Sequence, residues 1–372
     1  MTMPTRLRPF RLALAPLLVL GLSAPVAFAQ EEDETIQPRP SEMAPKSAQA
    51  LLTAIASAGD RLVAVGSRGH VLVSADGGAA WKQVPVPVRG LLTEVRFVDD
   101  QTGWAVGHDA TILKTTDGGE NWALQHFDAS QEPLLTVLPV TAEHIYAFGA
   151  FGLLLESRDG GNSWALKASE VADEGFHLNA VTRLGDDSLL LVGEMGMMAR
   201  SEDNGETWQR LTAPYDSSLF AVAARGDKGA IVGGLRGNVF VTDDAAAGEW
   251  TEIKTGTVQS IFNIVPEDGG AYVLVGLNAT LLRVDADGGV VPLSPTRVEA
   301  EGATPELPFV ALKSNGINDV EAGAYADALR LATARRYGDA TDLTIAWNAA
   351  RDDLLRTSFD LTQTTWGFSR DD

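Results

Sequence analysis

The chain repeats itself about every 42 residues, and this period limits the folds open to it more than any other feature. An eight-residue pattern, Ser/Thr-x-Asp-x-Gly-x-x-Trp, occurs four times. The copies are Ser74, Asp76, Gly78 and Trp81; Thr115, Asp117, Gly119 and Trp122; Ser157, Asp159, Gly161 and Trp164; and Ser201, Asp203, Gly205 and Trp208. A degraded fifth copy ends at Trp250, and a sixth, Asp285 to Gly289, has lost its tryptophan. The pattern indicates one supersecondary unit repeated in tandem.

A second signature, of the type Val-Gly-x-x-Gly, precedes each of these turns, for example at Val65 to Gly69 and at Val192 to Gly196. Short alternating apolar runs surround both signatures, so each repeat holds four strands joined by glycine-rich turns. Four strands in about 42 residues is the content of one propeller blade. We therefore predict an all-β propeller of four-stranded blades, whose repeats begin at Leu51, Leu91, Leu134, His177, Leu219 and Val258.

The acids of the eight-residue pattern are predicted to be structural. A Ser or Thr hydroxyl and an Asp carboxylate can both accept backbone N–H groups within a tight turn, and the tryptophan is then an apolar anchor between neighbouring blades. The Asp285 to Asp287 segment is similar to the start of a calcium loop, but Thr296 stands where a bidentate Glu is needed. We expect no metal and no cofactor.

The eight-residue turns match the Asp-box motif, also known as the BNR repeat. Together with the Val-Gly-x-x-Gly signature, they make Leu51 to Leu293 similar to the photosystem II stability/assembly factor family of secreted Asp-box propellers. That resemblance implies a seven-bladed, non-enzymatic scaffold, with photosystem II as the partner in phototrophs. Only six repeats are countable here, so a seventh blade would be degenerate or built from Val298–Gly316 with help from the N-terminal segment.

Composition excludes several other functions. The chain has 372 residues and a formal net charge of −21, which opposes binding to nucleic acid or to an anionic membrane surface. It has no cysteine, so disulfides, thiolate metal sites and a cysteine nucleophile are impossible.

Four segments are expected. Residues 1–29 have a basic start, an apolar stretch and a small-residue cleavage site, which predicts a Sec-type signal peptide cleaved after Ala29 and a periplasmic protein. Cleavage leaves a net charge of about −24. Residues 30–50 are expected to be a flexible leader, 51–318 the propeller, and 319–372 a tail whose first part, Asp319 to Arg336, has a helical composition. We expect a monomer that binds a membrane protein complex or envelope machinery without inserting into the membrane.

Strand alternation separates scaffold from candidate site. The Asp boxes join the third and fourth strands, whereas the Val-Gly-x-x-Gly turns and the blade-to-blade connections emerge on the opposite face. The residues of that face that we predict to bind a partner are Arg68, Arg89, Arg236, His108, Phe151, Phe127, Phe176 and Tyr215. The three arginines could converge on carboxylates of the partner, or each could form an ordinary surface ion pair.

The alternative function is a glycoside hydrolase, because Asp boxes also occur in sialidase-like propellers. Asp109, Glu194 and Asp216 could supply a pair of carboxylates on the candidate face. Of the tyrosines, only Tyr215 is placed there. His108, His126 and His177 come from different repeats, so nothing in their spacing brings them together as metal ligands.

Overall fold

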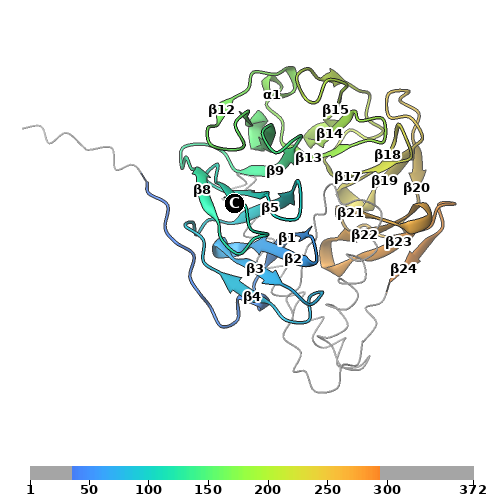
Figure 1. Cartoon of the computed structure of the whole chain (residues 1–372). Coiled ribbons are helices and arrows are strands. Elements are labelled where there is room, and N and C mark those ends of the chain that lie inside the picture. The colour runs from blue at the N-terminus through green and yellow to red at the C-terminus, as the bar shows by residue number, and fades with distance from the viewer. Residues whose placement is uncertain (1–35, 294–372) are drawn as a thin grey trace, which may run out of the picture. The chain divides into compact units, whose positions relative to one another are not determined.

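The prediction of a propeller is confirmed. The structure is a computed structural model, and it describes residues 36–293. Within that range six antiparallel sheets of four strands follow one another around a ring in chain order (Figure 1). Val298–Gly316, from which a seventh blade could be built if it is not degenerate, the helix expected from Asp319 and the signal peptide lie outside the described residues.

Each blade is an up-and-down meander whose first strand is the innermost, as in other propellers. Blade 1 comprises β1 (Leu52–Ala58), β2 (Arg61–Gly66), β3 (Val71–Ser74) and β4 (Lys82–Val84). Blade 2 comprises β5 (Leu92–Phe97), β6 (Gly103–Gly107), β7 (Ile112–Thr115) and β8 (Ala123–His126). Blade 3 comprises β9 (Leu134–Pro139), β10 (Ile145–Gly149), β11 (Leu154–Ser157) and β12 (Ala165–Leu166).

The second half of the ring follows the same plan. Blade 4 comprises β13 (Leu178–Arg183), β14 (Leu189–Gly193), β15 (Met198–Ser201) and β16 (Gln209–Arg210). Blade 5 comprises β17 (Leu219–Arg225), β18 (Gly229–Gly234), β19 (Val239–Thr242) and β20 (Thr251–Ile253). Blade 6 comprises β21 (Ile261–Glu267), β22 (Ala271–Gly276), β23 (Leu281–Val284) and β24 (Val290–Pro292). The α-helix of the described range, α1 (Glu170–Asp173), is a single turn between blades 3 and 4.

The Asp boxes fold as the sequence predicts. In blade 2 the Thr115 hydroxyl donates to Asp117 Oδ1 at 2.9 Å and accepts the N–H of Gly119 at 3.0 Å. Asp117 Oδ1 also accepts the N–H of Asn121 at 2.9 Å. Gly119 has a φ of +90°, and a Cβ there would lie 2.8 Å from a methyl group of Val63 in blade 1. The glycine is therefore required both by its conformation and by the close approach of the preceding blade.

Each Asp-box tryptophan packs against the preceding blade, which confirms its predicted place between blades. Trp122 belongs to the buried cluster that joins blades 1 and 2, and Trp208 to the one that joins blades 3 and 4. Trp81, Trp164 and Trp250 are partly buried against the clusters formed with blades 6, 2 and 4 respectively. Packing between blades is therefore repeated by the same residue type around most of the ring.

The two faces of blade 1 belong to different apolar clusters. Ala54, Val63 and Val73 face blade 2, whereas Ile55, Ala64 and Leu72, the alternate residues of the same strands, face blade 6. Val265, Val273 and Val275 of blade 6 complete that second cluster. The first and last described blades thus bury a shared apolar layer.

A buried ion pair joins three blades at the centre of the ring. Glu94 and Arg96 both lie on the inner strand of blade 2, are 0% and 3% exposed, and approach each other to 3.2 Å. The guanidinium donates to the carbonyl oxygen of Val181 in blade 4 at 2.7 Å, and the other oxygen of Glu94 accepts the N–H of Val137 in blade 3 at 3.2 Å. A pair that is buried this deeply is stabilising only while both partners are present.

The chain reaches the innermost strand by crossing blade 1 from its outer edge. Ser41 donates its N–H to the Val86 carbonyl oxygen at 2.9 Å, and the Gln83 side chain is hydrogen-bonded to the backbone of Glu42 and Ala44. Residues 30–50 are predicted to be a flexible leader, and within the described range Ser41 to Ala44 are attached to blade 1 by these bonds. We refer to residues 40–44 as the strap.

Truncation of an Asp-box tryptophan tests the packing between blades. Trp208→Ala is expected to lower the free energy of unfolding by about 3–5 kcal/mol, because it removes a large buried side chain between blades 3 and 4. Urea unfolding followed by circular dichroism measures this loss. Leu166→Ala, at a position that is 69% exposed, is the control and should change stability by less than about 0.5 kcal/mol. Equal effects of the two substitutions would contradict the assignment.

The central ion pair makes a second stability prediction. Glu94→Gln leaves the Arg96 charge buried without its counter-ion, so it should cost about 3–5 kcal/mol. The double variant Glu94→Leu/Arg96→Met removes both charges and should be closer to wild type than the single variant is. The measurement is the free energy of unfolding of all three proteins in urea. A double variant that is less stable than Glu94→Gln would show that the pair itself is net stabilising.

Candidate functional site

The candidate site lies on the face of the propeller opposite the Asp boxes. We call it the turn face; it carries the turns between second and third strands and the connections between blades, as strand alternation predicts. Most of these turns are short 3₁₀ segments: η2 (Ser67–Gly69), η3 (Ala150–Gly152), η4 (Glu194–Gly196), η5 (Leu235–Gly237) and η7 (Leu277–Ala279).

In blades 1, 3, 4 and 5 the second glycine of the signature lets the turn pack under the connection to the next blade; blades 2 and 6 have Ala110 and Ala279 at this position. Gly152 has a φ of +76°, and a Cβ there would lie only 2.1 Å from the carbonyl oxygen of Ala172. Its N–H donates to the carbonyl oxygen of Phe176 at 2.9 Å. The turn and the connection therefore hold each other in place, and the residue before the glycine is presented at the tip.

The tips carry side chains in a backbone conformation that disfavours them. The residues with left-handed φ are Arg68 (57°), Asp109 (59°), Phe151 (50°), Met195 (52°), Arg236 (58°) and Asn278 (52°). Only Asn278 and Asp109 are residue types that adopt this region readily. Phe151 and Met195 are also 57% and 59% exposed. Bulky or charged side chains that are both strained and exposed point to recognition rather than to stability.

Phe151 and Met195 occupy the tips of neighbouring blades 3 and 4, and buried polar groups lie beneath them. The ring of His177 packs edge-on against Phe151 with centroids 4.6 Å apart, and His177 Nδ1 lies 3.0 Å from Glu194 Oε2. Because His177 is 3% exposed, burial lowers its pKa despite the nearby Glu194 charge. His177 and Glu194 therefore support the turns that carry the exposed side chains of Phe151 and Met195.

The predicted arginines differ in their surroundings. Arg68 and Arg236 are exposed, and neither has an ion-pair partner among residues 36–293. Arg89 is already engaged: its Nη1 lies 2.9 Å from Glu42 Oε1 and its Nε donates to the Pro40 carbonyl oxygen at 3.2 Å. Convergence of all three arginines on one partner group stays a prediction.

The remaining predicted residues are only half-buried or packed within the face. Tyr215 packs against Phe240 with ring centroids 6.1 Å apart, and Phe176 lies against the apolar cluster of blades 3 and 4. His108 and Phe127 are half-buried in blade 2 and in the connection that follows it. Their part in binding also stays a prediction.

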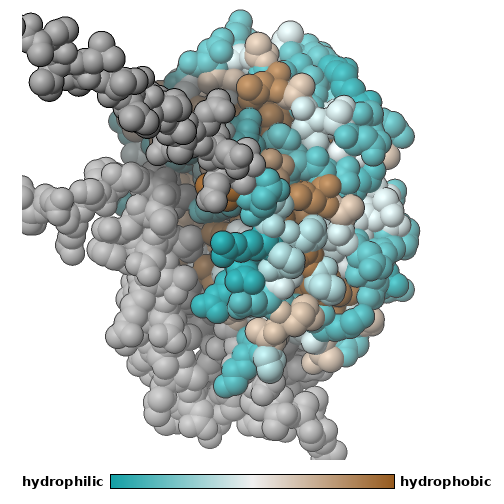
Figure 2. All heavy atoms as spheres, turned by 90° about the vertical axis from the view of Figure 1, so that its left-hand side faces the viewer, coloured by the Kyte–Doolittle hydropathy of each residue, from teal (hydrophilic) through white to brown (hydrophobic). Residues whose placement is uncertain are grey.

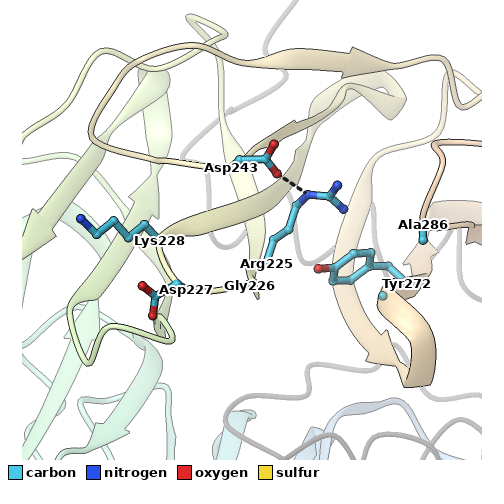
Figure 3. Close-up of a pocket in the computed structure, with 8 residues that line it drawn as sticks. Arg225, Gly226, Asp227, Lys228, Asp243, Tyr272 and Ala286 are labelled. Atoms are coloured by element: carbon cyan, nitrogen blue, oxygen red, sulfur yellow. Dashed lines mark hydrogen bonds and ion pairs between the residues drawn. The ribbon is translucent and has the colours of Figure 1, made fainter.

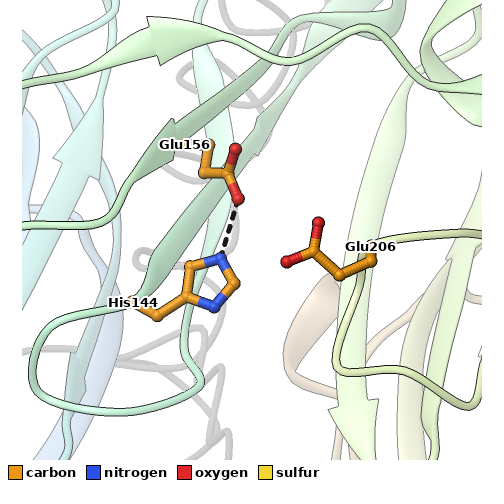
Figure 4. A group of neighbouring side chains, drawn as sticks. All are labelled: His144, Glu156 and Glu206. Atoms are coloured by element: carbon orange, nitrogen blue, oxygen red, sulfur yellow. Dashed lines mark hydrogen bonds and ion pairs between the residues drawn. The ribbon is translucent and has the colours of Figure 1, made fainter.

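The three histidines of the sequence analysis do not form a ligand group. In the part of the chain that the structure describes, the His, Asp and Glu side chains close enough to share an ion are His144, Glu156 and Glu206, whose ligand atoms lie within 4.8 Å of one another (Figure 4). This set is on the Asp-box side of blades 3 and 4, not on the turn face. Among the described residues, His108, His126 and His177 therefore do not form a group that could bind a metal ion.

Two cations already neutralise the His144 group. Arg158 bridges the carboxylates of Glu156 and Glu206, and Lys167 Nζ lies 3.6 and 3.2 Å from them. Burial raises the pKa of Glu156, but the His144 hydrogen bond and the charges of Lys167 and Arg158 outweigh it and hold that pKa below its usual value. A divalent ion would have to displace both cations, so the arrangement is an ion-pair network between two blades.

Figure 2 shows a side of the propeller on which hydrophilic side chains predominate and hydrophobic ones form small separate patches. No helix among residues 36–293 is long and apolar enough to cross a membrane.

The fold and its turns together define a class of protein: a propeller of four-stranded Asp-box blades. In this protein the Asp boxes repeat from blade to blade, whereas the residues at the tips of the turn face differ from blade to blade. Comparison with known proteins identifies the family within this class. A sequence profile described as "Photosynthesis system II assembly factor YCF48" matches residues 73–140 and 129–283, which together cover more than half of the chain. The chain belongs to this family.

Individual members of the family match this chain over a smaller part of its length or at low sequence identity. The Photosystem II assembly lipoprotein Ycf48 of Picosynechococcus sp. is 30% identical over 173 residues, which is 46% of this chain and 51% of the relative. The chain thus spans about half the length of that relative. A solved structure titled "YCF48 bound to D1 peptide" superposes with a TM-score of 0.55 at 17% identity, over 70% of this chain and 84% of the other. Virginiamycin B lyase from Staphylococcus aureus has a TM-score of 0.57 at 13% identity, over 74% and 92%. These structural likenesses show the fold alone.

The buried histidines make stability depend on pH. Burial lowers the pKa of His70, His108, His126 and His177 below the ordinary 6.5. The unfolded chain then binds protons more readily than the folded one, so stability should fall as pH decreases through about 6.5. The melting temperature should be lower at pH 5 than at pH 7.5, and His108→Gln should reduce that difference.

The Asp-box carboxylates act in a separate pH window. Hydrogen bonds from Ser163 and Thr207 lower the pKa of Asp159 and Asp203, so their contribution is lost only as pH falls below about 4. A melting temperature that stays constant between pH 7.5 and 5 would contradict the assignment to histidines.

Proposed function

We propose that this chain is a non-enzymatic, exported assembly factor that binds an extended segment of a membrane-complex subunit on its turn face. The observation that carries the proposal is the pair of exposed, strained side chains Phe151 and Met195 on adjacent blades. A left-handed backbone costs free energy at Phe and Met, and more than half of each of these two side chains is exposed. Binding a partner is the function that such a surface supports.

The charges around this pair indicate which partner chemistry fits. Arg68 and Arg236, unpaired among the described residues, extend from blades 1 and 5 on the same face. An occupant with an apolar centre and carboxylates toward its ends would contact both kinds of group. The solved relative named as bound to a D1 peptide supports a peptide segment as ligand, and the family supports a subunit of photosystem II or of a comparable membrane complex.

Export is supported in part by relatives that are named assembly lipoproteins. We propose that the chain acts in the periplasm after cleavage of residues 1–29. That cleavage is our prediction from the sequence.

A glycoside hydrolase remains the second candidate, because an ancestral GH74 enzyme shares the fold, with a TM-score of 0.52 at 14% identity, and carboxylates lie on the turn face. Among these acids Glu194 is one that could act in catalysis, but its Oε2 is ion-paired with His177 Nδ1 at 3.0 Å. A substrate-assisted or paired-carboxylate hydrolase needs an acid free to act on the glycosidic oxygen. Glu194 is therefore not free for that role, and the exposed, left-handed Phe151 and Met195 favour binding over hydrolysis.

Binding measurements on the full chain test the proposal. With a labelled synthetic D1 peptide as the probe, Phe151→Ala/Met195→Ala should weaken binding at least about tenfold, since exposed anchors of this kind carry most of an interface's free energy. Arg68→Glu/Arg236→Glu should weaken it further at low salt than at high salt. Leu166→Ala, away from the turn face, is the matched control and should bind like wild type.

A second readout separates the two candidate functions. Solubilised membranes passed over immobilised wild-type protein and over the Phe151→Ala/Met195→Ala variant should differ in the membrane subunits retained, as identified by mass spectrometry. Unchanged retention by the double variant would refute the turn face as the binding surface. Release of sugar from glycan substrates that is abolished by Glu194→Gln would favour the hydrolase instead.

A further inference from the structure

The junction between blades 5 and 6 lacks the tryptophan that packs at the other junctions between described blades. In blades 1 to 5 the tryptophan lies directly before the outer strand, opposite the last residue of the third strand. In blade 1, for example, Lys82 pairs with Val73, so the preceding residue, Trp81, stands opposite Ser74. In blade 6 the residue opposite Val284, the last residue of β23, is Val290. A partly buried valine therefore occupies the tryptophan position.

A hollow lies where that indole would be. Trp122 packs against a cluster that includes Val73 and Val84 of blade 1. The strand registers make Val241 and Ile253 the corresponding residues of blade 5. These two residues, with Val284, line an open hollow of about 780 Å³.

Tyr272 closes only part of the space. Its hydroxyl donates to the Ala224 carbonyl oxygen of blade 5 at 3.0 Å, which ties the two blades together in place of the lost indole. The ring borders both the hollow just described and an adjoining one of about 490 Å³, in which Arg225 is ion-paired with Asp243 (Figure 3).

The rim of the larger hollow is acidic. Among residues 36–293, Arg225 is the one basic residue that lines this hollow, and it is already paired; the acids are Asp243, Asp244, Glu249, Asp285 and Asp287. Asp244, Glu249 and Asp287 have no ion-pair partner among residues 36–293. An occupant therefore needs an aromatic side chain to match the space and positive charge beside it to match the rim.

We propose that this hollow is a second docking site, on the Asp-box side of the propeller, for a partner segment in which a tryptophan is flanked by Lys or Arg. The indole enters between Ile253, Val284 and Tyr272, where the chain's own tryptophan enters at the other junctions. The flanking cations pair with Asp244, Glu249 and Asp287. This site differs in place and in charge from the turn face, so it does not depend on the proposed function.

Calorimetric titration of the full chain with capped tripeptides tests the site. Lys-Trp-Lys should bind at least about tenfold more tightly than Lys-Ala-Lys, because only the former fills the hollow, and more tightly than Glu-Trp-Glu, because the rim repels the latter. Equal binding of Lys-Trp-Lys and Lys-Ala-Lys, or no binding of Lys-Trp-Lys, would overturn the proposal.

Two substitutions locate the binding. Val290→Trp restores the missing side chain and should abolish binding of Lys-Trp-Lys, whereas Val291→Trp adds the same residue at a position that is 48% exposed and should leave binding unchanged. Binding that survives Val290→Trp in a protein with an unchanged melting temperature would place the ligand elsewhere. Asp287→Asn, which keeps the oxygen that accepts the Gly289 N–H, should weaken binding by about two- to fivefold.

The chain has two further tryptophans, Trp347 and Trp366, outside the described residues. If wild type fails to bind Lys-Trp-Lys but the full-length double variant Trp347→Ala/Trp366→Ala binds it, the hollow is filled by the chain itself, and a partner is excluded as its occupant. Binding by both proteins with similar affinity supports the proposal.

Discussion

The packing of each blade against its predecessor is the interaction on which the rest of the structure depends. A four-stranded sheet of about 35 residues cannot bury both of its faces alone, and the second strands of these blades are buried at every residue except Arg61. The Asp box buries part of this surface by joining each blade to the preceding one. Its hydroxyl and carboxylate hold the turn together, and its glycine leaves room for the preceding blade. Its tryptophan packs on that blade's apolar face. Only because the scaffold is held from this side can the loops on the other face vary from blade to blade.

The repeat made the fold predictable, because one period carries the strands, the turns and their order. The place of the tryptophans was predictable for the same reason. The bond between Arg96 and Val181 was not, since it joins blades that are two apart and depends on how far one side chain reaches across the ring. The only trace of it in the sequence is a pair of opposite charges, Glu94 and Arg96, two residues apart on the inner strand.

The candidate site was predictable by face but not by residue. Alternation of strands places Phe151 and Arg68 on the turn face, and the structure agrees. What the sequence does not reveal is the surroundings of each side chain: Arg89 looks equivalent to Arg68 until Glu42, nearly fifty residues earlier, is found against it. The left-handed backbone at Phe151 and Met195 could have been anticipated, because the corresponding position in the last repeat is Asn278, a residue that adopts this conformation readily.

Ring closure also has a consequence for the order of folding. Most junctions join segments that are neighbours in the chain, but the cluster between blade 1 and blade 6 joins Leu52 and Leu72 to Val265 and Val275, roughly 200 residues later. Closing so long a loop is entropically costly and slow compared with forming one hairpin. During synthesis from the N-terminus, blade 1 therefore keeps one apolar face uncovered until blade 6 has emerged. The interval before closure is when this chain is most exposed to aggregation, and when a holding chaperone would matter most.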